Sequence, residues 1–242
     1  MTNVVIMPVY NEAATLSDVL AKIKVHHRGP IIAIDDGSTD ASGAILDQYG
    51  GIDVIRNQPN MGYGNALIKG FARALEKGYL LAVTIDCDEQ HEPALIPAMF
   101  ANINELDVLS GSRYLASEGG QDKPPEERRN INMTITALLN RITGYNLTDS
   151  FCGFKCYRLE AMKKLKLDET GYAMPVQFWV QASHFRLKVG EMAVPRIYKN
   201  LDRTFGGGID DPEKRLEYYK GVLEKELERW SISSPWEPTR TT

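Results

Sequence analysis

The chain has 242 residues, of which 43% are hydrophobic and 25% are charged, a composition typical of globular proteins. Its formal net charge of −4 excludes the strongly basic surface with which proteins bind nucleic acids. No basic segment followed by an apolar core opens the chain, and no run approaches about 18 apolar residues, so we expect neither a signal peptide nor a membrane-spanning helix.

Three cysteines, Cys87, Cys152 and Cys156, lack further Cys or His partners at zinc-site spacing. An odd number of thiols in a chain of this size favours reduced, buried cysteines and therefore a cytoplasmic protein. The length allows one large α/β domain or two small ones.

Strand and helix patterns alternate through the first 85 residues. Apolar runs predict strands at 4–7, 31–34, 54–55 and 80–85, and we expect Pro8 to end the first of them. The intervening helices are predicted to follow a cap at Asn11, a cap at Asp40 or Ser42, and a glycine-rich loop at 60–66. This alternation predicts right-handed βαβ crossovers and a parallel sheet.

The pattern of the second half is less regular. The predicted strands are 108–110, 154–157 and 189–194, and the predicted helices are 126–141, 175–185 and 212–230. Segments 117–127 and 198–211 contain clustered glycines or prolines among polar residues and are predicted to form flexible loops.

Two carboxylates, Asp86 and Asp88, follow the apolar strand at 80–85. At the carboxyl end of a buried strand they converge and repel one another unless a cation lies between them. Mg²⁺ and Mn²⁺ prefer hard oxygen ligands and usually bridge to substrate phosphates. The motif therefore indicates a metal–diphosphate site, although an isolated Asp-x-Asp is also compatible with a solvated acidic turn.

Polar clusters also follow the first two predicted strands, at 10–12 after the first and at Asp35-Asp36 after the second. In open parallel sheets, ligands bind outside the carboxyl ends of the strands. Three such clusters at one edge favour a ligand site over a chance acidic turn. By contrast, a tight turn before a helix explains Gly62 and Gly64 better than phosphate binding does.

The motifs MPVYNE, DDGSTD, the loop from Asn60 to Ala66 and DCDEQHEP resemble, in order and spacing, the signature of family 2 glycosyltransferases. GSRY at 111–114, DSFCGFKCYR at 149–158 and the segment around Arg203 are similar to the branch that contains dolichol-phosphate mannose synthases and other polyprenyl-phosphate glycosyltransferases. The resemblance runs from residue 4 to about residue 208. It implies an α/β GT-A fold, with a Rossmann-like, mostly parallel mixed sheet flanked by helices.

The resemblance further implies one GT-A domain over residues 1–230, followed by a tail at 231–242. Residues 1–90 would form the nucleotide-binding half, 91–211 the acceptor-binding half and 212–230 a C-terminal helix. The implied site residues are Pro8, Tyr10, Glu12, Asp36, Asp86 and Arg113 for donor binding, Asp88, Gln90 and Arg203 for catalysis, Asp86 and Asp88 for metal binding, and Arg129 for the acceptor phosphate.

The function implied by the resemblance is inverting transfer of a sugar from a nucleoside-diphosphate sugar, a GDP- or UDP-sugar, with Mg²⁺ or Mn²⁺ as cofactor. The expected acceptor is a polyprenyl phosphate, reached by a cytoplasmic protein that is peripheral to the inner face of the membrane. No nucleic acid partner is expected, and a homodimer is left open. The alternatives are a glycosyltransferase acting on a sugar hydroxyl or a small soluble acceptor, and a non-catalytic nucleotide-sugar-binding subunit.

Two departures from the family pattern bear on the acceptor. In relatives, the arginine and glycine of this segment are usually followed by Ser-Lys. Here Arg203 is followed by Thr204-Phe205 and three glycines. Gln177 stands where many relatives carry a helix acid, and an amide does not act as a base near neutral pH. A phosphate with a second pKa of about 6 is already ionised there, which favours a phosphate acceptor. Asp149 or Glu89 is the alternative base.

Overall fold

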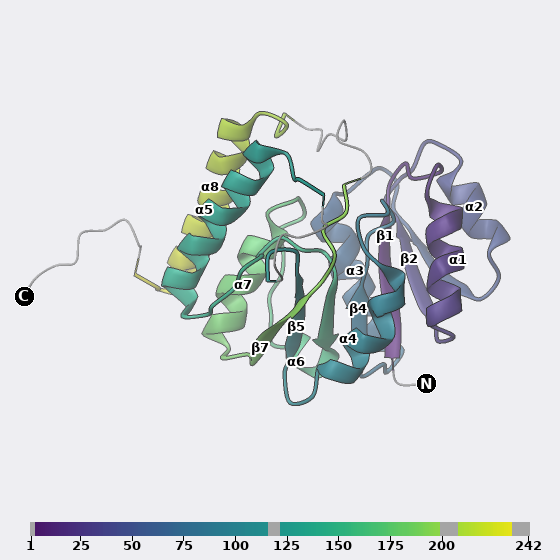
Figure 1. Cartoon of the computed structure of the whole chain (residues 1–242), viewed down its shortest axis with the longest axis horizontal. Coiled ribbons are helices and arrows are strands. Elements are labelled where there is room, and N and C mark those ends of the chain that lie inside the picture. Colours follow the sequence, from purple (N-terminus) through teal and green to yellow (C-terminus); the bar gives the residue numbers. More distant parts are fainter. Residues whose placement is uncertain (1–2, 116–121, 199–207, 234–242) are drawn as a thin grey trace, which may run out of the picture.

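Seven strands form one mixed sheet in the computed structural model, which describes residues 3–115, 122–198 and 208–233 (Figure 1). The strands are β1 (Asn3–Val9), β2 (Ile31–Asp35), β3 (Ile52–Arg56), β4 (Leu81–Thr84), β5 (Val108–Ser112), β6 (Lys155–Arg158) and β7 (Val189–Ala193). The helices are α1 (Leu16–His26), α2 (Ser42–Gln48), α3 (Tyr63–Glu76), α4 (Ile96–Asn102), α5 (Glu126–Thr143), α6 (Leu159–Met162), α7 (Met174–His184) and α8 (Pro212–Arg229), with a 3₁₀ turn, η1, at Pro93–Leu95.

The strand order in space is β3-β2-β1-β4-β6-β5-β7. Six of these strands run parallel, and β6 runs antiparallel between β4 and β5. The carboxyl ends of the six parallel strands therefore share one edge of the sheet, called here the carboxyl edge. Because β6 is reversed, it brings the residues that precede Lys155 to the same edge. The predicted mostly parallel mixed sheet is confirmed.

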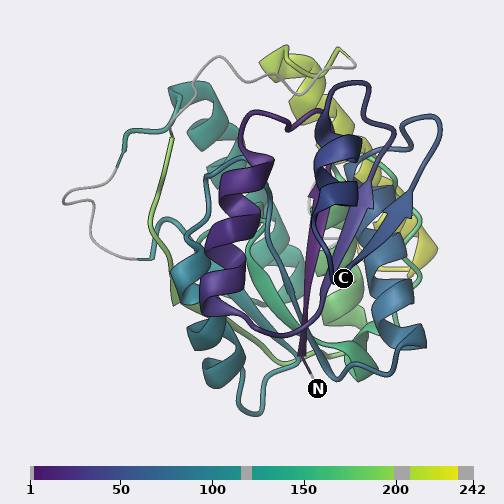
Figure 2. The same ribbon diagram turned by 90° about the vertical axis from the view of Figure 1, so that its right-hand side faces the viewer.

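Helices cover both faces of the sheet (Figures 1 and 2). Successive side chains of a strand point to opposite faces, so Val4 and Ile6 of β1 pack with α3, α5, α7 and α8, whereas Val5 and Met7 pack with α1, α2 and α4. Both faces of β1 are thus buried, as the apolar run in its sequence indicates. No helix in the described part of the chain is long and apolar enough to cross a membrane.

The prediction that Pro8 ends the first strand is wrong. β1 continues to Val9, and Pro8 is in register with Ile34 of β2. Pairing with β4 ends at Ile6, opposite Thr84, so only one neighbouring strand pairs with β1 at Pro8. A residue without an N–H is tolerated where a strand has lost one of its partners.

The predicted cap at Asn11 is also wrong, because α1 begins at Leu16, after Thr15. Asn11 instead adopts a left-handed backbone, with φ of 55°, and its side-chain carbonyl accepts the backbone N–H groups of Thr39 at 2.8 Å and Asp40 at 3.3 Å. Asn and Asp tolerate this conformation better than other residues. Asn11 therefore joins the loop after β1 to the loop after β2, where it supports the carboxyl edge.

Two elements were missed by the sequence patterns. One is η1 with α4, a segment in which Pro93 and Pro97 interrupt the helical pattern. The other is α6, which is four residues long and too short to show a period. The remaining predicted strands and helices occur, with bounds that differ by a few residues.

Candidate active site

The loop after β4 places Asp86 and Asp88 at the carboxyl edge. The Tyr63 hydroxyl donates to Asp86 Oδ1 at 3.2 Å, and the Asp86 N–H donates to His91 Nδ1 at 3.2 Å. Asp88 Oδ1 accepts the backbone N–H of Gln90 at 3.0 Å. Local hydrogen bonds therefore fix the loop that carries both carboxylates, and Gln90 lies directly beside Asp88.

The surroundings of Asp86 fit a divalent cation. Both candidate ligands are hard carboxylate oxygens, which suit Mg²⁺ or Mn²⁺. Gly153 keeps space beside Asp86, because a Cβ built there would lie under 3.0 Å from Asp86 Oδ2. In the described residues no group of three or more His, Cys, Asp and Glu side chains is placed to hold a metal. Mg²⁺ is usually bound by one or two protein carboxylates, and waters and substrate phosphates fill its remaining coordination positions.

The end of β1 and the residues after it pack against this loop. The Cys87 thiol donates to the carbonyl of Pro8 at 3.3 Å, and the Thr15 hydroxyl donates to the carbonyl of Cys87 at 2.6 Å. Tyr10 is 47% exposed, and Glu12 is half-buried beside Thr15. The structure thus brings the predicted donor residues Pro8, Tyr10 and Glu12 to the same edge as the two carboxylates.

Asp36 lies at this edge too, but its carboxylate is only 3% exposed. Oδ1 accepts the Asn57 amide at 2.6 Å and the Met61 N–H at 2.9 Å, and Oδ2 accepts the Gly62 N–H at 2.8 Å. Lys69 in turn donates to the Asn57 carbonyl oxygen. The carboxylate therefore holds the glycine-rich loop in place, a role that the sequence did not reveal because Asn57 and Lys69 belong to no motif.

The glycines of that loop are explained by close packing. Gly62 has a φ of 100°, and a Cβ at either Gly62 or Gly64 would lie under 3.0 Å from a carbonyl oxygen of residues 169–171. α3 begins at Tyr63, directly after Gly62. These contacts favour the turn interpretation of the glycines over a phosphate-binding one.

Arg113 follows β5 and forms a two-pronged ion pair with Asp149, with Nε 2.7 Å from Oδ2 and Nη2 3.0 Å from Oδ1. Asn132 also donates to Asp149 Oδ1 at 2.7 Å. Burial favours the neutral acid, but the Arg113 charge and these hydrogen bonds hold the pKa of Asp149 below its usual value. Asp149 is fully buried and engaged by donors, so its geometry suits orienting Arg113 better than accepting a proton.

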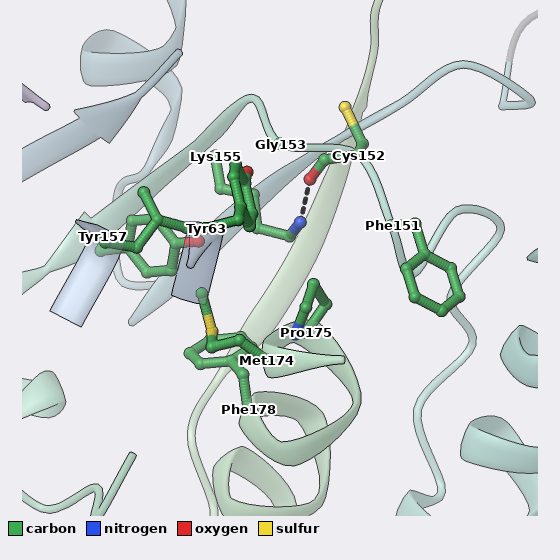
Figure 3. A pocket seen from close by; sticks show the side chains of 10 residues that line it. Tyr63, Phe151, Cys152, Gly153, Lys155, Tyr157, Met174, Pro175 and Phe178 are labelled. Atoms are coloured by element: carbon green, nitrogen blue, oxygen red, sulfur yellow. Dashed lines mark hydrogen bonds between the residues drawn. The ribbon is translucent and has the colours of Figure 1, made fainter. Parts of the chain in front are cut away.

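A small cavity of about 20 Å³, room for roughly one water molecule, lies beside the loop that carries Asp86 and Asp88, called here the metal loop (Figure 3). Tyr63 and Gly153, both next to Asp86, line it together with Lys155. The Lys155 ammonium donates to the carbonyl of Cys152 and lies 5.6 Å from the Trp179 ring. Burial lowers the pKa of Lys155. A buried lysine therefore lies close to the predicted metal site, and no sequence motif indicated it.

The sequence of the chain matches a known family. The glycosyl transferase family 2 model matches residues 4–166 of the chain. The chain belongs to glycosyl transferase family 2. It is therefore a glycosyltransferase, as the motifs predicted.

Relatives of this glycosyltransferase match it along most of its length. It is 26% identical over 244 residues to the undecaprenyl-phosphate mannosyltransferase of Micrococcus luteus, with 97% of this chain and 96% of the relative covered. It is 29% identical to the polyprenol monophosphomannose synthase of Mycolicibacterium smegmatis, with 93% and 88% covered.

A solved structure shows the same fold. Glucosyl-3-phosphoglycerate synthase from Mycobacterium tuberculosis, crystallised with Mn²⁺, uridine diphosphate and glucosyl-3-phosphoglycerate, matches with a TM-score of 0.70 at 18% sequence identity. The match covers 97% of this chain and 81% of that chain. The predicted GT-A fold is thereby confirmed.

Gln177 of this glycosyltransferase lies inside the fold. Its Oε1 accepts the N–H groups of Asp168 and Glu169, both at 2.8 Å. Its Nε2 donates to Asp168 Oδ1 at 2.7 Å and to Glu226 Oε1 of α8 at 2.8 Å. Both ends of the amide are engaged by these neighbours, so Gln177 joins α7 to α8, and its place at the position of the family's helix acid stays a prediction.

The predicted phosphate-binding arginines are only partly described. Arg129 lies in the first turn of α5, and Arg203 lies outside the described residues, as does most of the predicted 198–211 loop. Arg196, which the motifs did not single out, follows β7 and is buried at the carboxyl edge. Its Nε donates to the Asp122 carbonyl at 2.5 Å, and its guanidinium lies 5.6 Å from the Tyr114 ring. The sequence signal that could have pointed to Arg196 is its position shortly after β7, a strand that ends at the carboxyl edge.

Proposed function

We propose that this glycosyltransferase transfers a sugar, with inversion, from a GDP- or UDP-sugar to a polyprenyl phosphate. The observation that carries the proposal is the pair of carboxylates, Asp86 and Asp88, held at the carboxyl end of β4 in a family 2 fold. The names of the two relatives support the acceptor, since both are enzymes of polyprenyl phosphates or polyprenol monophosphates. The Mn²⁺ and uridine diphosphate of the solved relative support a metal-dependent donor.

The donor is assigned to the half of the chain before residue 90. Tyr10, Glu12 and Asp36 lie at the ends of β1 and β2, where nucleotides bind in related folds. Asp86 and Asp88 would hold Mg²⁺ or Mn²⁺, which neutralises the departing diphosphate when bound. The Tyr63 hydroxyl donates to Asp86 and the Gln90 N–H donates to Asp88, so both carboxylates are held before the donor binds.

The acceptor is assigned to the half that contains β5 to β7. Arg129 and Arg203 are proposed to bind the acceptor phosphate, because guanidinium groups make paired contacts to phosphate oxygens. Arg113, oriented by Asp149, is proposed to contact the donor diphosphate. Gln90, adjacent to Asp88, is proposed to lie beside the donor sugar.

The ion pairs of the two candidate bases support a phosphate acceptor. Asp149 is paired with Arg113, and Glu89 is paired with Lys22 of α1 at 3.0 Å. Both acids considered as general bases thus have cationic partners. A phosphate monoester with a second pKa of about 6 is ionised at neutral pH and needs no base. Its oxygen attacks the anomeric carbon as the bond to the diphosphate breaks, which inverts that carbon.

The lipid acceptor sets the proposed location. A polyprenyl phosphate keeps its chain in the bilayer and its phosphate at the surface, so the enzyme is proposed to work from the cytoplasm, at the inner face of the membrane. Residues 1–230 are proposed to act as one GT-A domain.

A transfer assay tests the proposal. The enzyme, Mn²⁺ and GDP- or UDP-sugars are incubated with a short-chain polyprenyl phosphate and, separately, with the matching polyprenol and with simple sugars. We expect transfer to the phosphate and its loss in Asp88→Asn, which keeps an oxygen for the Gln90 N–H but removes the charge. Transfer to a sugar hydroxyl with none to the phosphate refutes the acceptor. Metal-dependent nucleotide binding without any transfer supports a non-catalytic subunit instead.

A further inference from the structure

Tyr63 joins the glycine-rich loop to the metal loop. It is the first residue of α3, and its hydroxyl donates to Asp86 Oδ1 at 3.2 Å. Its ring stacks on Tyr172, with centroids 5.6 Å apart and planes 12° from parallel. The ring is thus held on one side while the hydroxyl reaches a carboxylate that follows a different strand. In Figure 3 it forms one wall of the small cavity.

The two residues before Tyr63 contact another carboxylate. The N–H groups of Met61 and Gly62 donate to Oδ1 and Oδ2 of Asp36, at 2.9 and 2.8 Å. Three consecutive residues, 61–63, therefore bridge the carboxylate after β2 to the carboxylate after β4.

The bridge formed by residues 61–63 is held from behind. The Asn65 N–H donates to the Thr170 carbonyl at 3.0 Å, and the missing Cβ atoms of Gly62 and Gly64 let residues 169–171 approach. A loop packed this closely on its outer side cannot move away from Asp86 without breaking these contacts.

We propose that Tyr63 is a positioning residue that orients Asp86 for the metal–diphosphate group of the donor. The inference rests on the proposed metal-dependent donor binding and adds to it a residue outside the Asp-x-Asp motif. The physical basis is that a ligating carboxylate with one oxygen held by a neutral donor loses less rotational freedom when a cation binds. Through residues 61–63, the same segment makes the positions of Asp36 and Asp86 depend on each other.

The experiment measures binding rather than turnover. Affinities of the parent for UDP and GDP are measured by calorimetry with and without Mn²⁺. For the nucleotide that binds, the metal enhancement is the affinity with Mn²⁺ divided by the affinity without it. In Tyr63→Phe, which keeps the stacked ring, we expect metal-free affinity to stay within about twofold and the metal enhancement to fall about tenfold. A parent that shows no Mn²⁺-dependent binding of either nucleotide contradicts the proposed function itself, before Tyr63 is tested.

Tyr145→Phe is the matched control. It also removes one phenol hydroxyl, which donates to the Leu187 carbonyl at 2.8 Å, outside the carboxyl edge. We expect its metal enhancement to equal that of the parent. Melting temperatures are measured to check that Tyr63→Phe and Tyr145→Phe are folded. The proposal is overturned if Tyr63→Phe keeps the full enhancement while only Tyr63→Leu loses it, because the ring alone would then matter. It is equally overturned if Tyr63→Phe weakens metal-free and metal-bound affinity by the same factor.

Discussion

At the scale of single residues, Gly153 is packed so closely against Asp86 that no larger residue fits there without displacing the carboxylate. Gly153 precedes β6, and its carbonyl accepts the Thr84 hydroxyl at 2.6 Å. This bond holds the Gly153 backbone against the carboxyl end of β4. Since a Cβ there would lie under 3.0 Å from Asp86 Oδ2 and 3.1 Å from Asp86 Cγ, the carboxylate has to turn if the glycine is replaced.

We therefore predict that Gly153→Ala lowers the metal-dependent part of nucleotide affinity by at least about tenfold, because it displaces a metal ligand. Calorimetric titration of nucleoside diphosphate with and without Mn²⁺ measures the effect. Gly221→Ala in the middle of α8 is the matched control, since nothing lies within 4 Å of its Cβ position. It should stabilise the fold by about 0.5–1 kcal/mol and leave metal-dependent binding unchanged. Equal nucleotide binding by the two variants contradicts the assignment of Asp86.

The residues that the sequence placed correctly at the carboxyl edge share one property. Each lies at the end of a strand or within four residues after it, so a local pattern of apolar residues ending in polar ones is enough to locate it. Tyr63 was not found, because its role depends on contacts between distant parts of the chain. The hydrogen bond that joins Gln177 to Glu226 was hidden for the same reason, since the two residues are 49 positions apart. Asn57 and Arg196 follow β3 and β7 but belong to no recognised motif.

At the scale of elements, one buried carboxylate fastens α8 to α7. Glu226 is 2% exposed and accepts hydrogen bonds from four side chains. The donors are Gln177, Gln181, Arg229 and Trp230, at 2.8 to 2.9 Å. Removing the acceptor would leave these groups without the oxygen that satisfies them, which is costly where they are buried.

We predict that Glu226→Ala lowers the free energy of unfolding by about 3 kcal/mol, because it removes a buried acceptor that four side chains share. Urea denaturation followed by circular dichroism measures the change. Glu228→Ala, two residues away and exposed, should change stability by less than about 0.5 kcal/mol. A similar loss in both variants would mean that the helix tolerates removal of the buried acid as easily as removal of the exposed one.

Elements with strong periodicity were predicted well, and those with conflicting local signals were not. The βαβ order of the first half follows from alternating apolar patterns. The prediction at Pro8 was wrong because a proline ends a strand only where a neighbouring strand would accept its N–H. The sequence of one strand does not show where its neighbours end. The direction of β6 was equally hidden, since its sequence pattern does not encode which strands lie beside it.

At the scale of the whole molecule, donor binding should appear as a gain in global stability. A ligand that binds only the native state at 100 times its dissociation constant adds about 2.7 kcal/mol. For a chain of this size that corresponds to a rise in melting temperature of about 5–10 °C. We predict this rise for nucleoside diphosphate with Mn²⁺, with UDP and GDP tested separately by thermal shift. In Asp88→Asn the increment due to Mn²⁺ should vanish, and its full retention would exclude Asp88 as a ligand.

The reversed strand β6 has a consequence for how the protein is made. β4 pairs with β1 on one side, but its other side waits for β6, so residues 85–154 must be synthesised first. At about 5–20 residues per second the ribosome leaves this hydrogen-bonding edge uncovered for several seconds. An open strand edge is a template for aggregation. We therefore expect the first 90 residues, cut out as a separate module, to expose this edge of β4 and to aggregate more readily than the whole chain.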